Sequence, residues 1–61
     1  MNVRWVLFDR NAAFVAEDFE TLSSLPALGD GKFINGKGYE VFAIVHTPHL
    51  SVVEQIFVKE C

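Results

Sequence analysis

The sequence predicts an all-β fold, either a small five-stranded barrel or a strongly bent antiparallel sheet. Apolar runs rich in β-branched and aromatic residues, which are typical of strands, recur along the chain. An Asn-Gly pair at 35–36 separates two of these runs, and tight hairpin turns favour that dipeptide. A chain of 61 residues is short for even one domain, so we expect residues 1–61 to form a single one.

The first apolar run, Val3–Phe8, is too short and too rich in β-branched residues to favour a helix, so we interpret it as a strand. The segment 12–22 is ambiguous. As a helix it would place Ala12, Val15, Phe19 and Leu22 on one stripe. As a strand it would form a hairpin with the first run across the short link 9–11. We favour the strand; the alternative is an α+β fold with one helix at 12–22 packed on a four-stranded antiparallel sheet.

The middle of the chain predicts a loop followed by a hairpin. Residues 23–30 contain Ser, Pro, Gly and Asp, which favour turns. The hairpin would pair the strand before Asn35-Gly36 with the strand 39–45 after it. Alternation along the second strand places Tyr39, Val41, Ala43 and Val45 inward, with Phe42 and Ile44 on the other face. Pro48 ends this strand, and a last strand is expected at 52–59.

Several of these positions carry a resemblance to a known class of small proteins. The run Leu25-Pro26 followed by Gly29-Asp30, then Gly36, Tyr39 and Val41 at fixed spacing, and His46, resembles small SH3-like β-barrels of unknown function from bacteria and phages. In such barrels the Gly-Asp pair introduces a strand and the later unit turns a hairpin across the barrel. The resemblance implies a five-stranded SH3-like barrel and no activity, because fold alone does not determine function.

Composition and charge disfavour several classes of function. The net charge is −3, and the five basic residues are scattered among eight acidic ones, so nucleic-acid binding is not expected. Apolar runs are too short to span a bilayer, and the first residues do not resemble a signal peptide. With a single cysteine, Cys61, the chain fits a reducing cytoplasm in a bacterium or a phage-infected cell.

The sequence contains no pattern that predicts catalysis or a cofactor. His46 and His49 are the only histidines, and Pro48 between them argues against a helix that would align them on a metal. We interpret both as exposed loop residues. Cys61 is terminal, and a terminal residue is poorly held for catalysis. The four glycines match turns better than a phosphate-binding loop. We therefore expect no enzyme, no bound metal and no cofactor.

The aromatic residues predict an interaction surface. Six Phe, one Trp and one Tyr are more rings than the core of so small a barrel can hold, so some must be exposed. Aromatic side chains are enriched where proteins bind one another. The candidate surface combines apolar residues of four expected strands with an acidic cluster: Phe8, Phe14, Phe42, Ile44, Phe57, Glu17, Asp18 and Glu20.

These observations favour a non-enzymatic protein–protein interaction module or a small subunit of an assembly. A protein partner is expected, and a second copy of the chain is one candidate. One alternative is a barrel that binds single-stranded nucleic acid by stacking bases on exposed rings. The other is a small metal- or ligand-binding domain that uses His46 and His49. The sequence does not indicate a biological process.

Overall fold

The protein forms one five-stranded sheet in a computed structural model, which describes residues 1–46 and 54–61. Within those residues there is no helix. The strands are β1 (Asn2–Phe8), β2 (Phe14–Thr21), β3 (Gly31–Ile34), β4 (Lys37–His46) and β5 (Glu54–Glu60). The predicted all-β fold is therefore confirmed, and the alternative with a helix at 12–22 is wrong.

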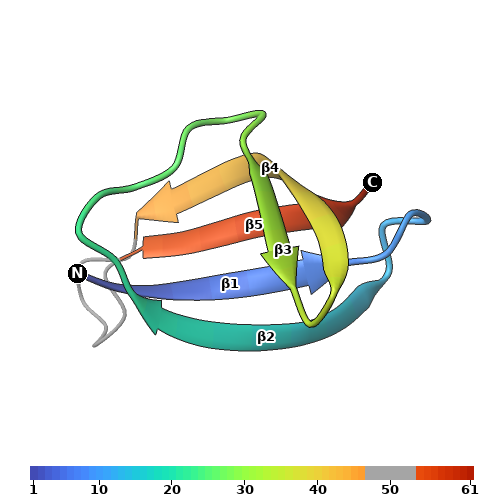
Figure 1. The fold of residues 1–61 in the computed structure, drawn as a ribbon, viewed down its shortest axis with the longest axis horizontal. Helices are drawn as coiled ribbons and strands as arrows, with labels where there is room; N and C mark the ends of the chain where they lie inside the picture. The colour runs from blue at the N-terminus through green and yellow to red at the C-terminus, as the bar shows by residue number, and fades with distance from the viewer. Residues whose placement is uncertain (47–53) are drawn as a thin grey trace.

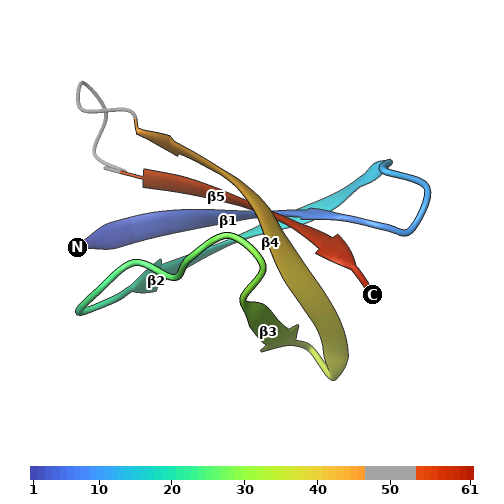
Figure 2. The same cartoon turned by 90° about the horizontal axis from the view of Figure 1, so that it is seen from above.

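The sheet has the order β2-β1-β5-β4-β3 and joins two antiparallel units by one parallel pairing. β1 and β2 form a hairpin, β3, β4 and β5 form a meander, and β1 runs parallel to β5. Figure 1 shows the long strands side by side, with β3 crossing in front of β1. Figure 2 shows how strongly the sheet curls, so that it makes half of a barrel with an inner and an outer face.

The inner face of the sheet holds the hydrophobic core. Cross-strand partners point to the same face, so the register identifies each face directly. The core cluster comes from four strands and consists of Val3, Trp5, Leu7, Ile34, Tyr39, Val41, Ile56 and Val58. The segment between β2 and β3 lies over this face (Figure 2), and Leu22 from it packs against the core.

Backbone hydrogen bonds hold both ends of that segment on the sheet. At its start, the amide of Leu22 donates to the carbonyl of Met1 at 2.8 Å. At its end, the amide of Gly29 donates to the carbonyl of Val41 at 2.8 Å, and the amide of Val41 donates to Asp30 at 2.9 Å. The predicted loop at 23–30 is thus a cover for the core rather than a free connection.

The hairpin at Asn35-Gly36 forms as predicted. Both residues have positive φ, 53° at Asn35 and 80° at Gly36, and two positive φ angles define the turn whose twist matches a hairpin. Ile34 pairs with Lys37 across it. The link between β1 and β2 is also tight, since the Asp9 carboxylate accepts hydrogen bonds from the amides of Asn11 and Ala13.

A bulge in β4 changes the predicted facing of its residues. The register with β5 shifts between Val41 and Ala43, leaving Phe42 as the extra residue. Tyr39 and Val41 point inward as expected, but after the bulge it is Ile44 that packs against the core. The prediction that Ala43 and Val45 point inward and Ile44 outward is therefore wrong. An inserted residue reverses the alternation beyond it, and the sequence pattern contains no sign of the insertion.

The turn predicts a difference between two glycine substitutions. Gly36→Ala should lower the free energy of unfolding by about 1–2 kcal/mol, because a Cβ is disfavoured at positive φ. Gly31→Ala is the matched control, since Gly31 lies in β3 and an added Cβ would meet its nearest atom at 3.9 Å. Its effect should stay within about 0.5 kcal/mol or be stabilising. Urea denaturation measures both, and equal losses would contradict the assignment of the turn.

Candidate functional site

Four phenylalanine rings meet on the outer face of the sheet. The ring of Phe8 on β1 stacks on Phe57 of β5 at 5.8 Å between centroids, with 18° between their planes. Phe42 meets Phe8 and Phe57 edge-on at 5.7 and 6.2 Å, and Phe14 meets Phe8 edge-on at 6.3 Å. We call Phe8, Phe14, Phe42 and Phe57 the phenylalanine cluster. Aromatic pairs favour these geometries, so the rings stabilise one another.

The register of the sheet explains why these four rings meet. β1 alternates Val3, Trp5 and Leu7 toward the core with Arg4, Val6 and Phe8 toward the outer face. Phe57 pairs with Val6, and Phe14 pairs with Phe8. Phe42 joins them because the bulge in β4 places its ring beside Phe8 and Phe57.

The phenylalanine cluster is open to solvent. Phe14 is 60% exposed and Phe42 is 50% exposed, whereas Phe8 and Phe57 are partly buried between them. Val6, which pairs with Phe57 on the outer face, is also buried although it lies outside the inner core cluster. The sheet therefore has two apolar faces, and within the described residues only the inner one has a covering segment.

The structure brings together four of the five apolar residues predicted for the interaction surface. Phe8, Phe14, Phe42 and Phe57 make one cluster. Ile44 packs against the core on the opposite face, because the bulge at Phe42 reverses the facing of the residues that follow it. Two further exposed rings make no ring contact with the cluster: Phe19 on β2, which is 57% exposed, and Phe33 on β3, which is 80% exposed. Sequence alternation around Phe42 pointed to the outer face, but it did not show which rings would touch.

The acidic residues Glu17, Asp18 and Glu20 do not form one patch. They lie on the edge strand β2, and the alternation of a strand sends Glu17 to the outer face and Asp18 and Glu20 to the inner side. Glu17 pairs with Arg4, whose Nε donates to it at 2.7 Å. The three carboxylates thus point to different sides of β2, and Glu17 is already paired within the fold, which argues against a single acidic docking site.

Glu20 connects three strands on the inner side. Its Oε1 accepts a hydrogen bond from the Trp5 indole at 3.0 Å and another from Lys32 Nζ at 3.1 Å. Lys32 also lies 4.9 Å from the centroid of the Trp5 ring, within cation–π range. The hydrogen bond from Lys32, and after it that from Trp5, lowers the pKa of the Glu20 carboxyl from its ordinary value of 4.5. This network links the two edge strands, β2 and β3, by side chains.

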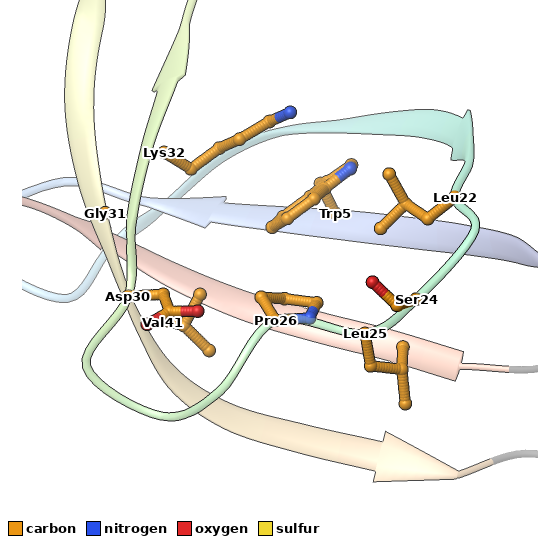
Figure 3. A pocket seen from close by; sticks show the side chains of 9 residues that line it. All are labelled: Trp5, Leu22, Ser24, Leu25, Pro26, Asp30, Gly31, Lys32 and Val41. Atoms are coloured by element: carbon orange, nitrogen blue, oxygen red, sulfur yellow. The ribbon is translucent and has the colours of Figure 1, made fainter.

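A hollow of about 550 Å³ lies beside this network, between the sheet and the segment that follows β2 (Figure 3). Its size is within the range of small-molecule sites. Its two charged side chains already have partners in the fold, because Lys32 binds Glu20 and Asp30 accepts a hydrogen bond from the amide of Ala27 at 2.9 Å. The Trp5 side chain on its floor is nearly inaccessible, with the residue 2% exposed. The hollow therefore presents little that would select a ligand.

His46 is held by a carboxylate rather than placed for a metal. Its Nδ1 lies 2.6 Å from Oε1 of the buried Glu54, which pairs the end of β4 with the start of β5. His49 lies outside the described residues. Among residues 1–46 and 54–61, no three His, Cys, Asp or Glu side chains gather closely enough to hold a metal ion. Cys61 carries an exposed thiol.

Comparisons with known proteins add no relative. The chain matches no family model, no curated protein and no solved structure. The resemblance to SH3-like barrels thus stays a prediction. In the part of the chain that the structure describes, no helix has the length and apolar character needed to cross a membrane.

The Glu20 network predicts a pH dependence with a defined sign. A carboxyl whose pKa is lower in the folded than in the unfolded state stabilises the fold above its unfolded value. That contribution is lost as the pH falls through the folded value. We expect Lys32→Met to raise the pKa of Glu20 toward 4.5, because it removes the first cause of the shift. The stability difference between wild type and Glu20→Gln should shrink as the pH falls below the ordinary carboxyl value of 4.5 and through the lower pKa of the folded state.

Carbon-13 NMR titration of the Glu20 carboxyl measures the first effect, and urea denaturation at a series of pH values measures the second. Lys37→Met is the control, since Lys37 lies at the hairpin turn away from Glu20. If Lys32→Met and Lys37→Met leave the Glu20 titration equally unchanged, the hydrogen bond from Lys32 does not lower its pKa.

Proposed function

We propose that this chain is a non-enzymatic protein–protein interaction module, or a small subunit of an assembly, whose contact surface is the phenylalanine cluster. The observation that supports the proposal is the second apolar face of the sheet. A sheet normally packs one apolar face on a core and leaves the other polar. Here the outer face presents four touching rings, two of them at least half exposed. A surface of this kind is typical of a partner site.

The arrangement of the rings also fits a binding surface. Aromatic side chains contribute large contact areas at small entropic cost, and energetically important residues gather near the centre of interfaces. Phe8 and Phe57 are partly buried and hold the more exposed Phe14 and Phe42 in place. The contact surface is therefore ordered before a partner arrives, which lowers the cost of binding.

The small size of the core supports the same proposal. A domain of about 60 residues buries only about 60% of the surface that its unfolded chain exposes. The core cluster has eight residues, and all of them lie on the inner face. A partner on the outer face would add a second apolar layer, as small scaffolds without disulfides often require. The proposal includes a cytoplasmic location, which the exposed thiol of Cys61 supports, since free thiols persist in reducing compartments.

Photo-crosslinking with a matched position tests this function. A photoreactive phenylalanine analogue would replace Phe42 in the cluster, and in a control chain it would replace Phe33, which is exposed but lies on β3. In cells of the organism that encodes the chain, we expect protein adducts from position 42 and not from position 33. Adding Phe14→Ser to the position-42 chain should reduce them, because Phe14 borders the same surface.

Equal yields of adducts at positions 42 and 33 would contradict the proposal, and so would a yield at position 42 that Phe14→Ser leaves unchanged. The identity of the crosslinked protein, whether another copy of the chain or a different protein, does not affect this test.

A further inference from the structure

We infer that the partner on the outer face is a second copy of this chain, in a two-fold symmetric dimer whose centre is the phenylalanine cluster. This inference rests on the proposed function and adds the occupant of the surface. Three features of the described residues support it: the charges of the outer face, the area that a dimer requires, and the charges along the free edge of β2.

The outer face is electrically neutral although the chain is not. Cross-strand pairing places four charged residues of the strands on this face, Arg4, Glu17, Glu40 and Lys59, of which two are cations and two are carboxylates. The net charge of −3 therefore resides on the rest of the molecule. Two copies can approach through this face without the repulsion that other approaches would meet.

The distribution of those charges also suits a two-fold axis. In a symmetric interface the same patch must complement itself, so it needs both signs of charge or none. Arg4 and Glu17 pair on one side of the cluster, and Glu40 and Lys59 are cross-strand neighbours in the β4–β5 pairing. Each copy thus presents a cation and a carboxylate at both margins of the rings. A partner with a strong single-sign charge would gain nothing from this pattern.

A dimer of this chain requires one broad contact face. A stable interface takes about 800 Å² from each partner, which is about a fifth of the 3898 Å² surface of this chain. In a molecule measuring 30 × 20 × 19 Å, that requires one broad face. The inner face is already covered by the segment between β2 and β3, so among the described residues the outer face is the broad surface left (Figure 2).

Dimerisation by edge-to-edge pairing of β2 is disfavoured by its own sequence. β2 is an edge strand of eight residues, so two copies of it could in principle extend the sheet. A two-fold axis at its middle would set a residue opposite its own copy, so that Glu17 would face Glu17 or Asp18 would face Asp18. Like charges directly opposite one another destabilise a strand pair, and charged edges are a known protection against such pairing. Association of two copies is therefore directed to the face of the sheet.

Sedimentation analysis of matched variants tests the inference. From low micromolar concentration upward, the wild-type chain should sediment with twice its mass of 6.9 kDa. Phe42→Glu should raise the dimer dissociation constant about thirtyfold or more, because it sets a charge among the rings. Phe33→Glu adds the same charge on β3 and should leave the dimer intact. Far-ultraviolet circular dichroism checks that both variants fold.

A pair of charge reversals provides a measurement that does not depend on the rings. Lys59→Glu makes the outer face net negative and Glu40→Lys makes it net positive, and both side chains are exposed. Each variant alone should dimerise more weakly than wild type, because like charges meet at the interface. An equimolar mixture in which one variant is labelled with nitrogen-15 should recover the dimer as a heterodimer, which native mass spectrometry identifies by its intermediate mass.

Several outcomes would overturn the inference. A wild-type chain of 6.9 kDa at every concentration would do so, as would equal weakening by Phe42→Glu and Phe33→Glu, or charge variants that do not complement each other. If the chain is monomeric and position 42 crosslinks specifically to a different protein, the inference of a second copy as partner is wrong, whereas the proposed function stands. If position 42 crosslinks no better than position 33, both are wrong.

Discussion

The parallel pairing of β1 with β5 is the interaction on which the rest of this structure depends. It is the only backbone pairing between the N-terminal hairpin and the C-terminal meander in the described sheet. It places Trp5 beside Ile56 on the inner face, and Val6 beside Phe57 on the outer face. A shift of one residue would exchange the two faces along either strand. Burial on both faces therefore determines the register, and the register in turn assembles both the core and the phenylalanine cluster.

The bulge at Phe42 is the second constraint, and it connects fold with the proposed interaction. Without it, β4 would continue the alternation set by Tyr39 and Val41, and Ile44 would point outward. With it, Ile44 packs against the core and the Phe42 ring reaches both Phe8 and Phe57. Bulges often re-aim side chains beside functional sites. Here one inserted residue adds Ile44 to the core on the inner face and Phe42 to the exposed cluster on the outer face.

The inner side shows how the curled sheet holds its edges together without a closed barrel. β2 and β3 are the two edge strands, and Glu20 on β2 binds Lys32 on β3. The indole of Trp5 donates to the same carboxylate from the floor between them. Trp5 and Lys32, which line the neighbouring hollow, both belong to this network, so their polar groups are used to stabilise the fold. On the outer face the four rings contact one another and two of them are at least half exposed, which is why we propose that face for recognition.

Four features could be predicted from the amino-acid sequence: the all-β class, the Asn35-Gly36 turn, the loop at 23–30 and the surplus of aromatic rings. Each is local, since it rests on the backbone preferences of a few neighbouring residues or on composition. The sequence favoured a strand over 12–22 without excluding a helix, and contacts in the folded sheet settled that residues 14–21 form one. The parallel run of β1 and β5 and the bulge of β4 at Phe42 were visible only in the folded sheet. Those features depend on contacts between residues far apart in the chain. The same reason explains why the sequence named Phe8, Phe14, Phe42 and Phe57 as surface candidates, while their assembly into one cluster required the register of three strand pairings.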